Sequence, residues 1–225
     1  MKRKSSFGKI IFLILFIIGG ALAGFVYFSP VFEKNKPEIV FEDNIYWNLK
    51  NKLDLKISDE SGIKYYKVIF KDGEKEIVLD TQILAKPIKN LDLELKSPEL
   101  DMFFKSTTIN IIVEAIDNSK WNFLEGNKIV KEFTLKIDRK KPIATAVANS
   151  YAIRRGGSAL VIVKVEDENL KDAYISFNDE KVFGLTPFYK ENYYAALIAW
   201  PVVIEDFKIV NLIATDKADN KTVTK

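Results

Sequence analysis

The sequence predicts an all-β protein, with two tandem immunoglobulin-like β-sandwich blocks after a single N-terminal transmembrane helix. Three observations support this prediction. An uncharged, apolar run occupies residues 10–28. Beyond it, short segments alternate apolar and polar residues with the period of two that half-buried strands show. Two stretches of similar sequence also recur roughly 100 residues apart, which is the size of one immunoglobulin-type sandwich.

The apolar run is long enough to cross a membrane as a helix. About 20 apolar residues span the roughly 30 Å hydrocarbon core, and in lipid the backbone must satisfy its own hydrogen bonds. We therefore expect residues 10–28 to be a membrane anchor, with Tyr27 and Phe28 at the outer interface. The anchor residues that represent this run are Ile10, Leu13, Phe16, Leu22 and Phe28.

The charges before the run predict its orientation. Four cations and no acid precede it, namely Lys2, Arg3, Lys4 and Lys9. Because cytoplasmic flanks of membrane helices are enriched in cations, residues 1–9 are expected to form a cytoplasmic basic tail. The chain is thus predicted to be a single-pass protein of the inner (cytoplasmic) membrane, in contact with lipid, with its C-terminal part in the periplasm.

Two alternatives remain open for this run. Ala21-Leu22-Ala23 has the small-x-small pattern of a signal-peptide cleavage site. The apolar character continues to Phe28, however, and this favours an uncleaved anchor. Gly20 and Gly24 form a GxxxG pair that could bring two helices together. Small residues are common in such helices, so the favoured interpretation is that they have no specific partner.

The composition limits the chemistry that the chain can perform. Among its 225 residues, 48% are hydrophobic and 29% charged, so the part beyond the run can build a packed core. The charge of that part is nearly balanced, which gives no electrostatic footprint for nucleic acid. Cysteine and histidine are absent, which excludes disulfides, thiol nucleophiles, His-based zinc sites and Ser-His-Asp catalysis. We expect no catalytic, metal-binding or cofactor-binding residues, and no enzymatic activity of this chain alone.

The first block, residues 37–138, is predicted to form an antiparallel sandwich. Its strands are expected at 53–57, 65–70, 77–79, 91–95, 107–115 and 133–137. Lys71-Asp72-Gly73 is predicted to form a turn, because Asp and Gly both favour turn conformations.

A charged linker, Asp138-Arg139-Lys140-Lys141-Pro142, is predicted between the blocks. In the second block, residues 142–225, strands are expected at 160–166, 173–177, 193–200 and 207–214. Only nine residues follow Asp216. We therefore expect this block to be truncated at its last strand and the chain to be the front part of a longer protein. A short natural closing strand is the alternative.

The two blocks share two phrases. Leu53–Glu60 parallels Val161–Glu168, and Ala115-Ile116-Asp117 parallels Ala214-Thr215-Asp216. An asparagine follows each Asp, at Asn122 and Asn220. An Asp at a strand end can accept backbone hydrogen bonds and Asn tolerates left-handed turns, so each phrase is predicted to close a hairpin. The alternative is a calcium site built from Asp216, Asp219 and Asn220. Calcium takes six to eight oxygen ligands, so turn formation is favoured.

Arg154 and Arg155 are the candidate interaction residues. They precede Gly156-Gly157, and their guanidinium groups could bind peptidoglycan carboxylates or a docked catalytic domain. A solvated hairpin corner is the favoured alternative. Aromatic side chains of the second block could stack on sugar rings, although a role in the sandwich core is favoured. They are Tyr151, Tyr174, Phe177, Phe183, Phe188, Tyr189, Tyr193, Tyr194 and Trp200.

The order of these features resembles a known family. The anchor, the first β block, the linker at 138–142, the stretch 151–161 and the phrase 214–220 are similar to the non-catalytic front half of membrane-anchored, lysostaphin-type (LytM-like) zinc metallopeptidases of Gram-negative bacteria. The resemblance covers most of the chain, and Arg-Arg-Gly-Gly-Ser-Ala-Leu-Val at 154–161 is its most specific phrase. That family cuts peptide cross-links in peptidoglycan with two His and one Asp as zinc ligands and a further His as base. Without any histidine, none of these roles can be assigned here.

The resemblance implies a non-catalytic, membrane-tethered periplasmic region of a peptidoglycan endopeptidase family protein. Such a region would position or regulate a cell-wall hydrolase domain that this chain lacks, because tethering raises the local concentration of a domain near the membrane. Its expected partners are lipid and either peptidoglycan or a peptidase domain. The alternative is a stand-alone envelope scaffold, or an adhesion-type protein, that binds partners through exposed sheet edges.

Overall fold

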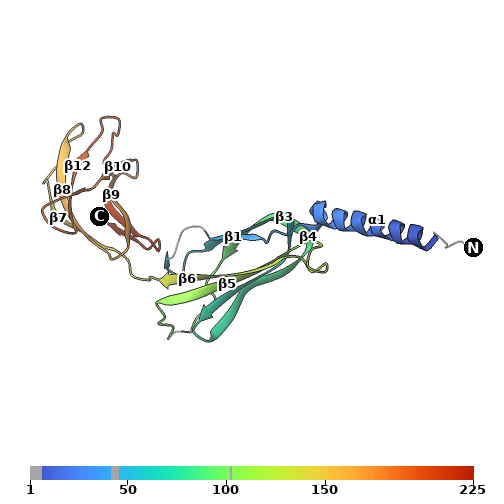
Figure 1. Ribbon diagram of the computed structural model, residues 1–225. Coiled ribbons are helices and arrows are strands. Elements are labelled where there is room, and N and C mark those ends of the chain that lie inside the picture. The colour runs from blue at the N-terminus through green and yellow to red at the C-terminus, as the bar shows by residue number, and fades with distance from the viewer. Residues whose placement is uncertain (1–6, 42–45, 102) are drawn as a thin grey trace, which may run out of the picture. The chain divides into compact units, whose positions relative to one another are not determined.

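A computed structural model describes residues 7–41, 46–101 and 103–225. The protein is mostly β-strand with one N-terminal helix, as predicted (Figure 1). Helix α1 (Phe7–Phe28) contains one segment, Gly8–Phe28, that is long and apolar enough to span a membrane, and none of it is buried against the described chain. A 3-10 turn, η1 (Pro30–Phe32), follows it. Three of the four cations on which the predicted orientation depends lie outside the described residues, namely Lys2, Arg3 and Lys4.

Six strands after the helix form one sheet. They are β1 (Glu38–Phe41), β2 (Tyr46–Trp47), β3 (Leu53–Asp72), β4 (Lys75–Leu95), β5 (Thr108–Asp117) and β6 (Lys128–Ile137). The order is β1-β3-β5-β6-β2, and β4 pairs with β3 alone among the described strands. β3 pairs antiparallel with β1, β4 and β5, whereas β2 runs parallel to β6.

The strands β3 and β4 form one long hairpin, which corrects the sequence-based prediction. The segments predicted at 53–57 and 65–70 belong to a single strand, and so do those at 77–79 and 91–95. The polar residues that separate the segments suggested loops, but they lie in a bulge of β3 between Ser58 and Ile63. Asp59 supports this bulge, because its carboxylate accepts hydrogen bonds from the backbone N–H groups of Ser61 and Gly62. The predicted turn follows Asp72, where the hairpin reverses through Gly73.

Eight further strands form two four-stranded sheets. They are β7 (Ile143–Asn149), β8 (Ser158–Glu166), β9 (Leu170–Phe177), β10 (Lys181–Gly184), β11 (Thr186–Pro187), β12 (Tyr193–Ala199), β13 (Val210–Asp216) and β14 (Lys221–Thr224). One sheet has the order β10-β9-β13-β14 and the other β11-β12-β8-β7. The last described strand, β14, pairs with β13 in antiparallel register.

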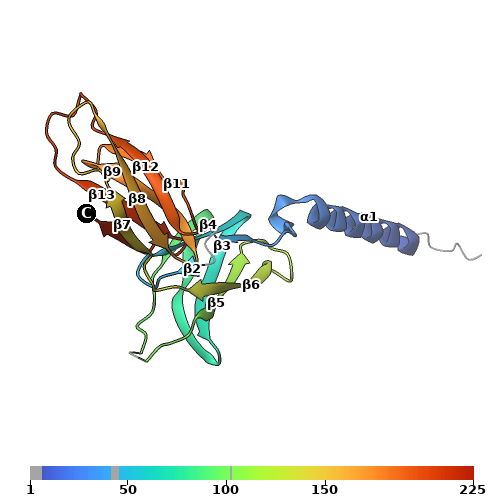
Figure 2. The ribbon, with the colours of Figure 1, turned by 90° about the vertical axis from the view of Figure 1, so that its left-hand side faces the viewer.

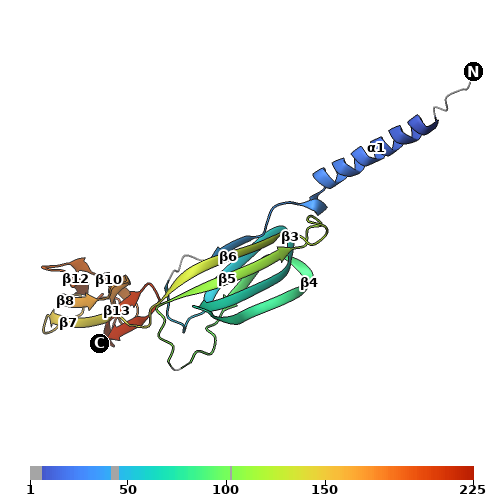
Figure 3. The ribbon, with the colours of Figure 1, turned by 60° about the horizontal axis from the view of Figure 1, so that its bottom comes forward.

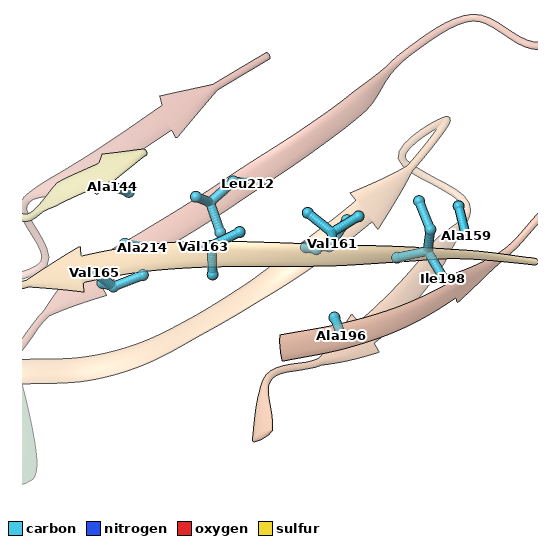
Figure 4. Packing of buried hydrophobic residues seen from close by; sticks show 10 residues of the cluster. Ala144, Ala159, Val161, Val163, Val165, Ala196, Ile198, Leu212 and Ala214 are labelled. Atoms are coloured by element: carbon cyan, nitrogen blue, oxygen red, sulfur yellow. The ribbon is translucent and has the colours of Figure 1, made fainter. Parts of the chain in front are cut away.

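One core lies between these two sheets. Alternate residues of β8 point inward, and Val163 and Val165 are almost completely buried (Figure 4). They pack against β12 on their own sheet and against Leu212 and Ala214 of β13 on the facing sheet. The layered arrangement of β8, β9, β12 and β13 can be followed in Figure 2. Burial of β-branched side chains from both sheets is what replaces disulfides as the source of stability here.

Packing divides the chain into two compact units. The first unit comprises residues 1–42, 53–98 and 110–133, and the second comprises residues 43–52, 99–109 and 134–225. The first unit therefore contains α1, η1, β1, β3, β4, most of β5 and the start of β6. Its core is formed by inward residues of β3 and β5, such as Ile57, Val68 and Val113.

Candidate functional site

A fully buried carboxylate ends strand β5. Asp117 is not exposed at all, yet every hydrogen bond that a buried charge needs is supplied locally. Its Oδ1 accepts from the backbone N–H groups of Ser119 (3.0 Å) and Asn127 (2.8 Å), and its Oδ2 accepts from Asn127 Nδ2 (2.8 Å). The carboxylate thus closes the β5–β6 connection, as predicted for an Asp at a strand end.

The second unit repeats this arrangement at the end of β13. Asp216 is also completely buried, and its Oδ1 accepts from the backbone N–H groups of Ala218 (2.8 Å) and Asn220 (2.8 Å). Asn220 Nδ2 donates to Asp216 Oδ2 at 2.8 Å. Each carboxylate is therefore bound by two main-chain N–H groups and one asparagine side-chain amide, so the internal repeat extends to individual atoms.

The asparagine that binds the buried carboxylate in the first unit is Asn127, ten residues after Asp117. Asn122, which follows Asp117 more closely in the sequence, has a left-handed φ of 50°, as expected for an Asn in a turn, and in the described structure it does not bind that carboxylate. In the second unit Asp219 takes the left-handed conformation instead, with a φ of 60°. The two connections differ in length, so a fixed offset from the Asp could not identify the equivalent residue.

Each asparagine also binds the chain that enters its unit. Asn127 Nδ2 donates to the backbone oxygen of Glu33 at 2.9 Å, and Asn220 Nδ2 donates to the backbone oxygen of Asp138 at 3.0 Å. A sequence signal for this equivalence exists and was missed. Glu33-Lys34-Asn35-Lys36-Pro37 matches Asp138-Arg139-Lys140-Lys141-Pro142, with an acid four residues before a proline in both.

Three acids gather at the entry to the first unit, and we call them the acidic cluster: Glu33, Asp59 and Asp117. One carboxylate oxygen from each lies within 4.8 Å of the others. Burial, and then the neighbouring charge of Asp59, raise the pKa of Glu33 above its usual range. In the second unit the pKa of Asp167 is raised in the same direction by burial, and further by Asp216 and Asp138.

Among the described residues, the acidic cluster is the one group of three acids whose carboxylate oxygens lie close enough together to share a metal ion. Glu33 Oε2 is buried without a partner, whereas both oxygens of Asp117 already accept N–H donors. Calcium takes six to eight oxygens, so the three acids would supply only part of a shell. The alternative calcium site at Asp216, Asp219 and Asn220 has other partners, because Asp216 binds N–H groups and Asp219 pairs with Lys171 at 2.8 Å.

The chain that leaves α1 is bound directly to the first unit. Val31 O accepts from the backbone N–H of Lys120 at 2.7 Å, and Glu33 O accepts from Ser119 Oγ at 2.6 Å. The Lys34 ammonium lies 4.0 Å from the ring centre of Tyr27 and 4.7 Å from that of Trp121. These contacts join the end of the helix to the β5–β6 connection, which lies beside η1 in Figure 3.

The two predicted interaction residues have different surroundings. Arg155 donates from Nε (2.8 Å) and from Nη2 to the backbone oxygen of Val202, so it fixes the loop after β12. Gly156, with a φ of 78°, donates its N–H to Trp200 O at 2.8 Å in the same corner. Arg154 is exposed, and its guanidinium group has no partner among the residues that the structure describes. Arg154 is thus the better candidate for contact with an external carboxylate.

The aromatic residues of the second unit divide between core and surface. Phe177 is buried in the core, and its ring forms a triangle with those of the partly buried Trp200 and the exposed Phe207, with ring centres 5.7–6.0 Å apart. Tyr151 and Tyr189 are exposed instead. The predicted anchor residues, all exposed on α1, are Ile10, Leu13, Phe16, Leu22 and Phe28.

Comparisons with known proteins identify no family. No protein-family model matches the chain, and it has no significant match among curated proteins.

Proposed function

We propose that this chain is a non-catalytic, membrane-tethered region that holds or regulates a peptidoglycan endopeptidase domain on the periplasmic side of the inner membrane. That domain would lie in the same polypeptide or in a partner. In this proposal both units are immunoglobulin-like sandwiches that act as a rigid support for the endopeptidase domain. The observation that carries the proposal is the joint between α1 and the first unit, where Val31 and Glu33 bind the β5–β6 connection through backbone oxygens.

This joint favours a rigid support over a flexible tether. A flexible linker confines its cargo only by its length, whereas a hydrogen-bonded joint also limits the direction in which the cargo points. The lack of histidine in the sequence favours a supporting role over hydrolysis by this chain. Arg154 adds an exposed guanidinium group, which can bind peptide-stem carboxylates.

Muropeptide analysis tests the role in the cell wall. Cells that lack the protein are compared with cells complemented by the full chain, or by a variant whose α1 is replaced with a cleavable signal peptide. We expect the proportion of cross-linked muropeptides to change without the protein and to recover only with the anchored chain. Unchanged muropeptides in all strains would contradict the role in wall hydrolysis.

The predicted orientation has its own test. The chain has no cysteine, so single cysteines can be introduced by Gly8→Cys and Lys225→Cys without removing any other thiol. A membrane-impermeant maleimide added to intact spheroplasts should label position 225 and leave position 8 unlabelled until the membrane is permeabilised. The reverse pattern would place the β units in the cytoplasm.

A stand-alone envelope scaffold is the second candidate, and strand β4 favours it. In the described part of the chain β4 pairs only with β3, which leaves its other edge open over most of 21 residues. An open edge can accept a strand from a partner. Cross-links from β4 to envelope proteins, together with unchanged muropeptides, would favour the scaffold.

A further inference from the structure

The β5–β6 connection carries an exposed apolar tip, which we define as Trp121, Asn122, Phe123 and Leu124. Phe123 is 98% exposed and Leu124 is 64% exposed. Asn122, Phe123 and Leu124 have positive φ angles of 50°, 56° and 74° in succession. Bulky residues rarely adopt this conformation, so the surroundings must hold it. Two large apolar side chains are thereby directed away from the core.

The tip is held by backbone contacts on both sides. Before it, Lys120 N–H donates to Val31 O at 2.7 Å and Asn118 N–H donates to Gly62 O at 2.8 Å. After it, Gly126 N–H donates to Trp121 O at 3.2 Å. Lys64 Nζ also donates to the carbonyl of Glu125. The tip is therefore a shaped loop with fixed ends.

The tip lies at the level where α1 ends. Val31, which binds Lys120, comes three positions after the last residue of the helix. The Lys34 ammonium bridges the rings of Tyr27, on the last turn of α1, and Trp121, at the start of the tip. Tyr and Trp are enriched at membrane–water interfaces, where an apolar ring and a polar atom meet different media. In this protein the Tyr27 and Trp121 rings both lie beside Lys34, next to the end of α1.

We propose that the tip is a second membrane contact, which inserts Phe123 and Leu124 into the interface of the leaflet from which α1 emerges. The inference rests on the proposed anchor. A lipid surface is the partner that fits, because the Lys34 ammonium lies against both Tyr27 of α1 and Trp121 of the tip, which keeps the tip beside the end of the helix. It also combines apolar side chains with the exposed cations Lys34 and Lys120, which can face lipid phosphates.

Two attachment points would have a consequence that one helix lacks. A single helix leaves the attached unit free to rotate about the membrane normal and to tilt. A second contact at Phe123 fixes the tilt, so the strands of the first unit leave the membrane in one direction. Apolar burial at the interface and the hydrogen-bonded joint then act together to orient the unit.

Depth-dependent quenching in vesicles tests the contact with the full chain. Phe123→Cys introduces the only thiol, and a nitrobenzoxadiazole dye attached there reports polarity and collisions with lipid. The protein is reconstituted in phosphatidylcholine–phosphatidylglycerol vesicles that contain spin-labelled lipids. Val78→Cys is the matched control, because Val78 is also an exposed apolar residue of the first unit. Val78 pairs with Ile69, whereas the β5–β6 connection binds β3 at Gly62, in the bulge farther along the strand.

We expect the dye at position 123 to show blue-shifted emission and to be quenched by lipids spin-labelled near the headgroup, while the dye at position 78 is not quenched. Protein that floats with the vesicles but whose position 123 is not quenched would overturn the second contact and leave the anchor intact. Blue-shifted emission without quenching would mean that a protein covers the tip, and it would also overturn the inference. Failure of the unlabelled chain to float with vesicles would overturn the anchor, and the tip contact with it.

Discussion

Asn127 donates to both carboxylate oxygens of Asp117, from its backbone N–H at 2.8 Å and from its Nδ2 at 2.8 Å. The same Nδ2 group also donates to the backbone oxygen of Glu33 at 2.9 Å. Asn127 therefore binds the buried carboxylate through its backbone and its side chain, and the same side chain also binds the segment that follows the helix. Asn220 repeats both contacts in the second unit, which shows that the repeat preserves this joint rather than only the strands.

Replacing Asn127 should destabilise the first unit much more than replacing Asn122. Asn127→Ala leaves Asp117 Oδ2 without the amide donor, and a buried polar group that loses its partner costs about 1–3 kcal/mol. Asn122→Ala removes an exposed side chain and should cost under about 1 kcal/mol, the strain of a left-handed alanine. Thermal and urea unfolding of the detergent-solubilised chain measure both. An equal or larger loss for Asn122→Ala would contradict the joint described here.

Much of this architecture could be predicted from the sequence, because alternation at period two and a long apolar run are local signals. The apolar segment 10–28, and the strands around Leu53, Val161 and Ala214, follow from such signals. The length of the β3–β4 hairpin could not be predicted, since the polar residues near Asp59 signal a loop and form a bulge instead. The pairing of Asn127 with Asp117 was equally hidden, because it depends on how the intervening loop folds back.

Arg155 and Arg154 are neighbours in the sequence, yet only Arg155 should affect the order of the loop after β12. Arg155→Ala removes two donors to Val202 O and should destabilise the loop 200–206 by about 1 kcal/mol. Cleavage by chymotrypsin after Phe207, at the end of this loop, should accelerate as a result. Arg154→Ala removes the same charge without removing a contact to the described part of this loop, and it is the matched control. Faster cleavage in Arg154→Ala, or none in Arg155→Ala, would refute this assignment.

The raised pKa of Glu33 predicts a pH-dependent effect of Glu33→Gln. A carboxyl group whose pKa is raised by folding contributes stability below its unfolded pKa, about 4.3, and loses that contribution as the pH rises through the folded pKa. Charged Glu33 therefore opposes folding at neutral pH. Glu33→Gln keeps an oxygen that can accept from Asn35 N–H, and should match or exceed the wild-type free energy of unfolding at pH 7.

The difference should shrink as the pH approaches 4, where the wild-type Glu33 also becomes neutral. Unfolding is measured from pH 4 to 8 with a chelator present, so that contaminating cations cannot neutralise the acidic cluster. Glu38→Gln, which removes an exposed charge on β1, is the control for net charge. A clear loss of stability in Glu33→Gln at pH 7 would show that the charged carboxylate has a favourable partner and that the pKa shift has the opposite sign.

Alanine substitutions at two glycines distinguish the loss of stability caused by a left-handed backbone from the loss caused by crowding at Asp117. Gly126 and Gly73 both have positive φ, 84° and 58°. An added Cβ at Gly126 would lie 2.5 Å from the backbone oxygen of Asp117 and 2.7 Å from its Oδ1, whereas nothing lies within 4 Å of one at Gly73. Gly73→Ala should cost about 1 kcal/mol through the left-handed backbone alone. Gly126→Ala should cost that amount and more, because the carboxylate it displaces is buried and fully bonded. Equal losses for the two variants, measured by urea unfolding, would mean that the chain around Asp117 yields easily and does not form a rigid joint.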